Sequence, residues 1–259
     1  MCRFLAYLGE PIYLEDLVCK PRHSLLRQSL RALEAQCATQ GDGFGLGWYG
    51  ERETPGVYHE VMPAWSDENL LSLCAQVRSG LCFAHVRAAT GGGIARQNCH
   101  PFRHGPWLFI HNGQIGGYAR LRRVLEAKLP DALYEQRRGA TDSELLFLLI
   151  VARLQAGANA EEAVRAVLAE TLAAMRERGI EEPLRFAAAL ADGQQVWAFR
   201  WASDAGAPSL YLKPQRGGWA VASEPLGDDA EAWVAIPQGQ LVHLREGLQH
   251  SRPLSLAPG

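Results

Sequence analysis

The chemistry that this sequence could perform begins at its second residue, Cys2. Methionine aminopeptidases generally remove an initiator methionine when the next residue is small, and cysteine is small enough. Removal of Met1 would place a thiol and a free α-amine on the same residue. Because an α-amine has a pKa of about 7.7–8.0, it can serve as a general base for that thiol near neutral pH. Position alone is weak evidence, since a cysteine after the start methionine is usually accidental.

The segment His85–Thr90 reads His-Val-Arg-Ala-Ala-Thr and is a second candidate. Side chains alternate between the two faces of a strand, so Phe83, His85 and Arg87 would share one face. An arginine in an apolar run is costly unless it is paired, and its planar guanidinium fits a carboxylate through two parallel hydrogen bonds. The residues leave two interpretations of Arg87 open: it holds the α-carboxylate of an amino-acid substrate, or it forms an internal salt bridge.

The segment His111–Gly113 follows an apolar run and is a third candidate. Asn-Gly after such a run most often forms a tight turn. The functional alternative is an oxyanion hole, made by the side-chain amide of Asn112 and the backbone N–H of Gly113. Each donor of this kind can stabilise a transition state by about 3–4 kcal/mol. Glycine also permits a backbone orientation that other residues resist.

The segment Thr141–Glu144 has the pattern of a helix capping box, with threonine as N-cap and glutamate three residues later. Such a cap would hold Asp142 in the first turn, where its carboxylate could accept hydrogen bonds from a substrate α-ammonium group. The two interpretations are compatible. The glycine-rich segment 41–45 is expected to allow close backbone packing beside the site. His100–Phe102 and Ala222–Pro225 are interpreted as structural.

Strands and helices must bring these segments together, and their order along the chain indicates the fold class. Strands dominate the first part, helices lie in the middle, and strands return from residue 184, with a hairpin expected at residues 192–193. This order favours layered α+β packing over regular βαβ alternation, in a single domain spanning residues 2–259. The expected strands are 2–8, 80–88 and 106–112, and the expected helices are 14–38 (mostly helical), 118–129, 141–154 and 160–178.

Composition limits the partners and the location of the protein. Lys and Arg number 26 and Asp and Glu number 28, so the net charge of −2 gives no electrostatic case for binding nucleic acid or a membrane surface. No stretch approaches the roughly 20 apolar residues that span a bilayer, and the apolar run Phe4–Leu8 is too short for a signal sequence. We therefore expect a cytoplasmic protein.

Six cysteines are present, without any C-x-x-C pair. Cys82, His85, Cys99 and His100 would be the only basis for a zinc site, and Cys82 and His85 would point to opposite faces of a strand. We expect no metal site.

Taken together and in this order, the candidate segments resemble the class II glutamine amidotransferases. The pattern of that family is a cysteine exposed by methionine removal, then D-G-x-G, H-x-R-x-A-T, H-P-F, H-N-G and T-D-S-E. The resemblance covers roughly the first 150 residues. The matching segments are Cys2, Asp42–Gly45, His85–Thr90, His100–Phe102, His111–Gly113 and Thr141–Glu144.

The resemblance implies a four-layer αββα sandwich, in which two antiparallel sheets lie between layers of helices, as in N-terminal-nucleophile hydrolases. It also implies roles: Cys2 is the nucleophile and its own amine the base, and Asn112 with Gly113 forms the oxyanion hole. The reaction would cleave a γ-carboxamide through a γ-glutamyl thioester, without a cofactor. The implied substrate-binding residues are Arg87, Asp142, His111 and Thr90.

The resemblance leaves three functions open. The segment Thr39–Gly43 differs from the arginine-glycine-tyrosine-aspartate loop of the large synthase-fused members. The opening Met1–Gly9 is instead similar to stand-alone members, one group of which hydrolyses a γ-glutamyl bond in ergothioneine biosynthesis. The first function is a hydrolase acting on a small γ-glutamyl substrate, either glutamine or a conjugate. The alternatives are a glutaminase subunit that supplies ammonia to a separate synthase partner, and a non-catalytic glutamine-sensing protein.

Overall fold

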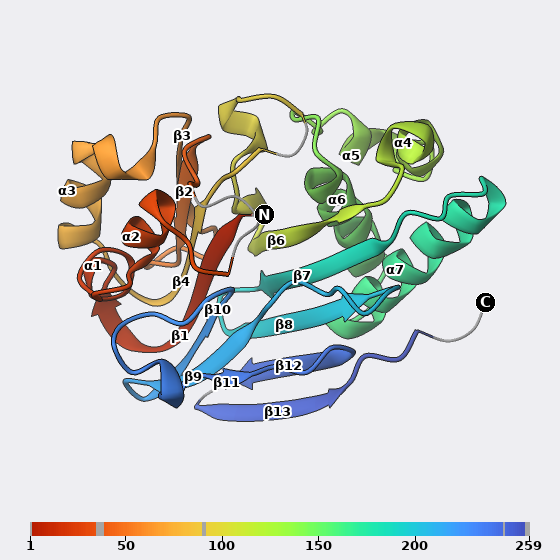
Figure 1. Cartoon of the computed structure of the whole chain (residues 1–259). Coiled ribbons are helices and arrows are strands. Elements are labelled where there is room, and N and C mark those ends of the chain that lie inside the picture. The colour runs from red at the N-terminus through yellow and green to blue at the C-terminus, as the bar shows by residue number, and fades with distance from the viewer. Residues whose placement is uncertain (1, 35–38, 90–91, 246, 257–259) are drawn as a thin grey trace.

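Two antiparallel sheets stack face to face and form the centre of the molecule (Figure 1). The computed structural model describes residues 2–34, 39–89, 92–245 and 247–256. Sheet A has the strand order β11 (Val234–Ala235), β9 (Tyr211–Gln215), β10 (Gly218–Ala222), β1 (Arg3–Tyr13), β4 (Arg78–Val86), β2 (Phe44–Trp48) and β3 (Gly56–Glu60). Sheet B has the order β13 (Leu248–Pro253), β12 (Gln240–Arg245), β8 (Gln195–Ala202), β7 (Leu184–Ala191), β6 (Trp107–Ile115) and β5 (Phe102–His104).

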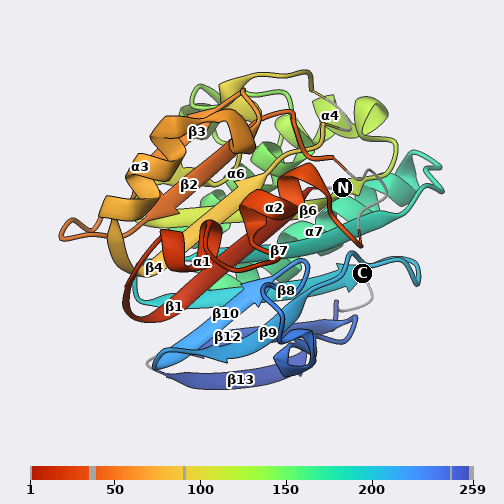
Figure 2. The ribbon, with the colours of Figure 1, turned by 60° about the vertical axis from the view of Figure 1, so that its left-hand side comes forward.

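Helices cover the outer face of each sheet, which completes four layers (Figure 2). Over sheet A lie α1 (Glu15–Val18), α2 (Leu25–Leu30) and α3 (Glu68–Gln76). Over sheet B lie α4 (Tyr118–Glu126), α5 (Asp131–Tyr134), α6 (Asp142–Gln155) and α7 (Ala160–Glu177). The expected α+β class and αββα layering are confirmed. Within the described ranges, no helix combines the length and apolar character that crossing a bilayer requires.

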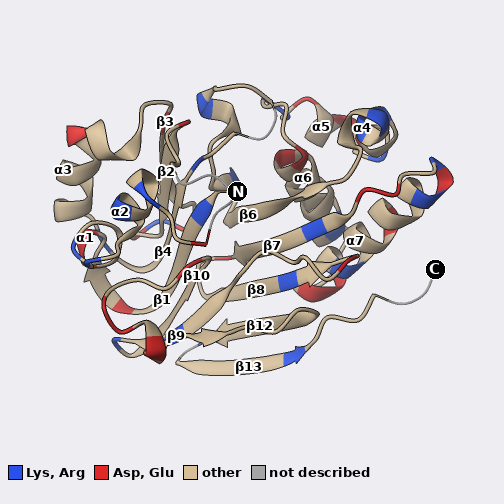
Figure 3. Ribbon diagram, in the orientation of Figure 1, with Lys and Arg blue, Asp and Glu red and all other residues tan. Residues whose placement is uncertain are grey.

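Strand alternation explains how one chain builds three apolar cores. In β1, Phe4 and Ala6 pack into the core between the sheets, whereas Leu5 and Tyr7 pack toward α1–α3. On sheet B, alanines such as Ala189 supply much of the inner face, and small side chains let the sheets approach closely. Charged residues of both signs are interspersed on the outside of the α4–α7 layer (Figure 3).

Helix α6 is apolar on nearly all sides because it lies between sheet B and neighbouring helices. Its start is capped as predicted: the Oγ1 atom of Thr141 accepts a hydrogen bond from the backbone N–H of Glu144 at 3.2 Å. A full capping box also requires the Glu144 side chain to accept a hydrogen bond from the backbone N–H of Thr141, and this half of the prediction was wrong. The Glu144 carboxylate instead accepts from the backbone N–H groups of Arg138 (2.9 Å) and Gly139 (2.7 Å), so it fixes the loop before the helix.

Two further expectations about local structure were wrong. Residues 14–34, the described part of the segment expected to be mostly helical, contain only two short helices, because Pro21 follows α1 and Ser24 caps a separate helix, α2. Residues 35–38 of that segment lie outside the described residues. The Asn112–Gly113 pair is not a tight turn, because β6 continues through it and pairs with β7. The hairpin at 192–193 is confirmed by the antiparallel pairing of β7 with β8.

Candidate active site

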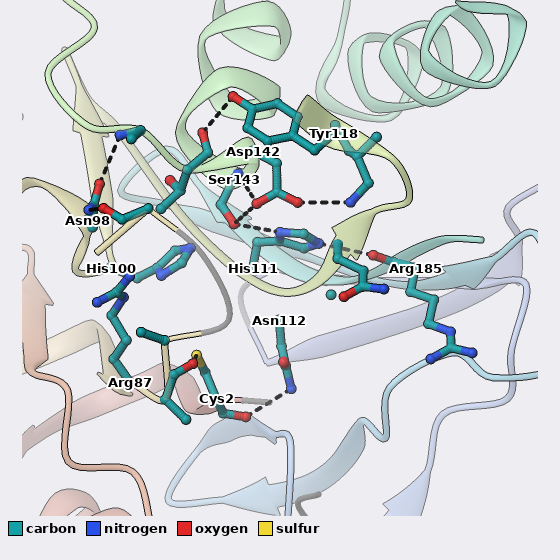
Figure 4. Close-up of a pocket in the computed structure, with 18 residues that line it drawn as sticks. Cys2, Arg87, Asn98, His100, His111, Asn112, Tyr118, Asp142, Ser143 and Arg185 are labelled. Carbon is teal, nitrogen blue, oxygen red and sulfur yellow. Dashed lines mark hydrogen bonds between the residues drawn. The ribbon is translucent and has the colours of Figure 1, made fainter. Parts of the chain in front are cut away.

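A cavity of about 260 Å³ opens where β1, β4 and β6 approach the first turn of α6 (Figure 4). It gathers predicted site residues from four separate segments of sequence. Thr90, the remaining predicted site residue, lies outside the described residues, as does Met1. The predicted residues that line the cavity are Cys2, Arg87, His111, Asn112, Gly113 and Asp142.

Cys2 immediately precedes β1, an interior strand of sheet A that pairs with β4 on one side and β10 on the other. Its thiol donates a hydrogen bond to the carbonyl oxygen of Ala88 at 3.4 Å. Burial raises the pKa of the Cys2 thiol, which outweighs the lowering effects of the Ala88 contact and nearby positive charge. A thiol in this setting is protonated at neutral pH, so a nucleophilic role for it would require a base.

The residues next to Cys2 are fixed by the segment that follows β10. The backbone of Phe4 donates to the Oγ atom of Ser223 at 2.9 Å, and the Arg3 guanidinium donates to the Ser223 carbonyl at 3.0 Å. Arg3 also pairs with the carboxylate of Glu224 at 3.7 Å, and Glu224 in turn contacts Nε2 of His23 at 2.6 Å. The late segment 222–225, interpreted from the sequence as structural, therefore holds the start of β1 in place.

Arg87 follows β4 and is held by the glycine-rich segment before β2. The backbone of Arg87 donates to the carbonyl of Gly43 at 2.8 Å, and the backbone of Asp42 donates to the carbonyl of Arg87 at 3.0 Å. The Asp42 carboxylate accepts from the backbone N–H of Ala89 at 2.8 Å. The segment 41–45 thus does more than pack closely, because Asp42 shapes the backbone that carries Arg87.

Asn112 and Gly113 reach the cavity from β6 in sheet B. The side-chain amide of Asn112 donates to the carbonyl oxygen of Cys2 at 3.0 Å. Gly113 has a φ of 143°, and a Cβ atom at this position would lie 2.0 Å from the carbonyl oxygen of Arg185. Glycine is therefore required here, both for backbone conformation and for space.

Asp142 lies in the first turn of α6, with both carboxylate oxygens partly engaged by the protein. Oδ2 accepts from the backbone N–H of Ile115 at 2.8 Å, and Oδ1 accepts from that of Ser143 at 2.9 Å. These contacts join the start of α6 to the end of β6. The carboxylate keeps further acceptor capacity on the cavity side.

His111 lines the cavity, and protein groups engage both of its ring nitrogens. Burial lowers the pKa of His111 although the nearby Asp142 raises it, so we take the ring as neutral. Nε2 lies 3.3 Å from the carbonyl oxygen of Arg185, which can only accept, so Nε2 carries the proton. Nδ1 then accepts from the Ser143 hydroxyl at 2.8 Å. His111 thus connects the floor of the cavity to α6 and β7.

Asn98 is a site residue that the sequence analysis did not single out. Its Nδ2 atom donates to the carbonyls of Gly92 (2.6 Å) and Gly93 (3.2 Å), and its Oδ1 atom accepts from the backbone N–H of Ala140 at 3.0 Å. It joins two loops that line the cavity. The available signal was an asparagine just before the H-P-F segment, but only the fold shows which loops it joins. Among the residues that the structure describes, no group of three or more His, Cys, Asp or Glu could hold a metal ion.

Comparison with known proteins identifies the family. The family described as class-II glutamine amidotransferases matches residues 20–205. The chain belongs to the class-II glutamine amidotransferases. It is therefore an enzyme of this amidohydrolase class, and its αββα sandwich agrees with the N-terminal-nucleophile fold of the family.

Two known proteins resemble the chain over nearly its whole length. It is 30% identical to the probable glutamine amidotransferase DUG3 of Saccharomyces cerevisiae, over 95% of this chain and 82% of the relative. It is also 30% identical to the gamma-glutamyl-hercynylcysteine sulfoxide hydrolase of Mycolicibacterium smegmatis, over 95% of this chain and 96% of that enzyme.

A solved glutamine aminotransferase class-II domain protein from Silicibacter pomeroyi superposes with a TM-score of 0.78 at 35% identity, covering 99% of this chain and 100% of that one. The glutamine phosphoribosylpyrophosphate amidotransferase of Bacillus subtilis shares the fold at 15% identity and a TM-score of 0.66, covering 99% of this chain and 50% of that one.

Proposed function

We propose that this class-II amidotransferase hydrolyses the γ-amide of a small γ-glutamyl substrate, either glutamine or a γ-glutamyl conjugate, with Cys2 as nucleophile after removal of Met1. The observation that carries the proposal is the single cavity that holds the Cys2 thiol together with the side chains of Arg87, Asn112 and Asp142 (Figure 4). Similarity to the gamma-glutamyl-hercynylcysteine sulfoxide hydrolase over almost the full length of both chains supports hydrolysis of a conjugate.

The charges of the cavity suit a free amino-acid end. Arg87 supplies a cation for an α-carboxylate, and Asp142 supplies an anion for an α-ammonium group. Because burial keeps the ring of His111 neutral, it adds no further charge to this pair. The two charges of the site are therefore complementary to the two charges of a zwitterionic amino-acid end. With that end bound, the γ-carboxamide of the substrate extends toward Cys2.

The reaction follows from the groups around Cys2. The free α-amine of processed Cys2 takes the thiol proton, and Sγ forms a bond to the γ-carbonyl carbon. The side-chain amide of Asn112 and the N–H of Gly113 stabilise the negative charge that develops on the carbonyl oxygen. The protonated amine then gives its proton to the departing ammonia or amine, which leaves a γ-glutamyl thioester. Water, deprotonated by the same amine, hydrolyses the thioester and releases glutamate.

The test measures glutamate release from glutamine and from a panel of γ-glutamyl amides, after intact mass spectrometry has shown that Met1 is absent. We expect release by the wild type and by the control variant Cys19→Ser, whose cysteine packs at the edge of the core beneath α1–α3. We expect none from Cys2→Ala. Full activity in Cys2→Ala would refute the mechanism. A processed enzyme that binds the amides without cleaving them would instead favour a partner-dependent glutaminase or a sensing role.

A further inference from the structure

His100 differs from the other histidine that lines the cavity. It is buried, with 4% of its surface exposed, yet neither ring nitrogen has a hydrogen-bond partner among the described residues. Both ring nitrogens of His111, by contrast, are engaged. A buried polar atom without a partner costs about 1–3 kcal/mol, so such atoms call for an explanation. Since His100 faces a cavity built for a polar ligand, the ligand itself is a candidate partner.

Packing rather than hydrogen bonding orients the His100 ring. The ring lies between those of His85 and Phe102, with centroids 4.5 Å from each. The backbone is held equally closely, because a Cβ atom on Gly45 of β2 would lie 2.1 Å from the carbonyl oxygen of His100. The ring is therefore held in direction by packing, while its two buried nitrogens have no partner among the described residues.

The ring is also neutral. Burial, with smaller effects from the nearby His85, His111 and Arg87, lowers the pKa of His100 well below its usual value. A neutral imidazole offers one N–H donor and one acceptor. It can therefore donate a hydrogen bond beside Arg87 without placing a second positive charge in the cavity.

We propose that His100 is a substrate-binding residue, whose ring N–H donates a hydrogen bond to the substrate α-carboxylate that Arg87 holds. This inference rests on the proposed function. His100 and Arg87 lie on the same side of the cavity in Figure 4 and interact electrostatically. A carboxylate has about four acceptor positions, and a guanidinium fork occupies two of them, so a further donor can be accommodated. The H-P-F segment, interpreted from the sequence as structural, thereby acquires a role in substrate selection.

The experiment measures binding, so that it does not depend on turnover. In a Cys2→Ala background, isothermal titration compares L-glutamine with 4-aminobutanamide, which is the same molecule without the α-carboxylate. His100→Phe keeps an aromatic ring between His85 and Phe102 but removes both nitrogens. We expect it to weaken glutamine binding by about 10-fold or more, as for the loss of a hydrogen bond to a charged group. Binding of 4-aminobutanamide should change by less than about twofold.

Additional variants separate recognition from folding. His100→Gln restores a donor and should recover most of the glutamine affinity. His104→Ala removes a histidine outside the cavity and should leave both affinities unchanged. If His100→Phe does not fold, His100→Leu takes its place as the variant without nitrogens.

If His100→Phe weakens the binding of both ligands equally, or leaves glutamine binding unchanged, the proposed role of His100 is overturned while the proposed function stands. If the Cys2→Ala protein binds neither compound nor any γ-glutamyl amide of the panel, the proposed function falls, and the inference falls with it.

Discussion

The side-chain amide of Asn112 donates a hydrogen bond to the backbone carbonyl of Cys2 across 3.0 Å. This contact joins the two sheets, because Cys2 leads into β1 of sheet A and Asn112 belongs to β6 of sheet B. One amide N–H is used to hold Cys2, and the amide has a second N–H to offer. The proposed oxyanion donor and the proposed nucleophile are therefore aligned by direct contact.

Replacing Asn112 with alanine tests that arrangement. We expect kcat for glutamate release to fall by about 10²–10³-fold, because one donor to the developing oxyanion is lost. KM should change much less, since the donor acts mainly in the transition state. Steady-state kinetics on the best γ-glutamyl amide measures both constants. A rise in KM at unchanged kcat would assign Asn112 to ground-state binding instead.

Gly113→Ala should abolish activity and destabilise the fold. The added methyl group would meet the carbonyl oxygen of Arg185 at 2.0 Å, and the φ of 143° is unfavourable for alanine. Strands β6 and β7 would have to separate at the cavity. Urea unfolding and an activity assay measure the two effects. The control is Gly50→Ala, where nothing lies within 4 Å of the new methyl group and stability should be retained. Wild-type activity in Gly113→Ala would contradict the assigned geometry.

Glu224→Gln should destabilise the protein by about 3 kcal/mol, because removing one partner leaves the other charge buried and unpaired. Arg3 and Glu224 are only 1% and 2% exposed, and the Glu224 carboxylate also accepts from the backbone N–H groups of residues 33 and 34. Urea unfolding measures the change. The matched control is Glu182→Gln. Glu182 pairs with Arg120, and both side chains are 54% exposed, so the loss of this ion pair should leave the free energy of unfolding almost unchanged. Equal stability of both variants would show that the buried pair is dispensable.

The buried histidines His85 and His100, whose rings are in contact, predict how the free energy of unfolding depends on pH. Burial lowers the pKa of His85 to about 3, whereas an unfolded histidine titrates near 6.5. Between these two pKa values, His85 binds a proton in the unfolded chain but not in the folded protein. The contribution of neutral, buried His85 to the free energy of unfolding is therefore fully present above about pH 6.5 and is lost as the pH falls toward 3. Each such histidine contributes a slope of about 1.4 kcal/mol per pH unit, and His100 adds to the effect.

Urea unfolding of the wild type and of His85→Phe, at several values between pH 7 and pH 5, measures this slope. The variant replaces one titrating ring with a ring that does not titrate, so its stability should decline less steeply with acidification. Identical slopes would mean that His85 takes up its proton as readily in the folded protein as in the unfolded chain, contrary to its burial.

The sequence predicted best where a local pattern and a buried face agree. Alternation along β4 predicted opposite faces for Phe83 and Ala84. The structure confirms this, because Phe83 packs into the core between the sheets and Ala84 packs toward α1–α3. The sequence also predicted α6 from its long apolar run and the start of that helix from the N-cap residue Thr141, and both are confirmed. In each case nearby residues alone determine the outcome.

The sequence predicted poorly where distant segments decide. Residues 14–34 contain two short helices, and the backbone of residues 33 and 34 is held by Glu224, some 190 residues away. The Asn112–Gly113 pair has the composition of a turn, but β7 pairs with it as strand. The setting of His100 depends on ring contacts with β4 and β5, which no spacing along the chain reveals.

Finally, the position of β1 has a consequence for heat inactivation. Terminal residues usually fray before a protein melts. Here the residue after Cys2 enters a strand bonded on both sides, Arg3 opposite Val86 and Leu5 opposite Ala222, in the interior of sheet A. Loosening of the backbone directly after Cys2 would require the sheet to part. On heating, catalytic activity should therefore persist until the cooperative melting of the whole fold and vanish with it, rather than decay at lower temperatures.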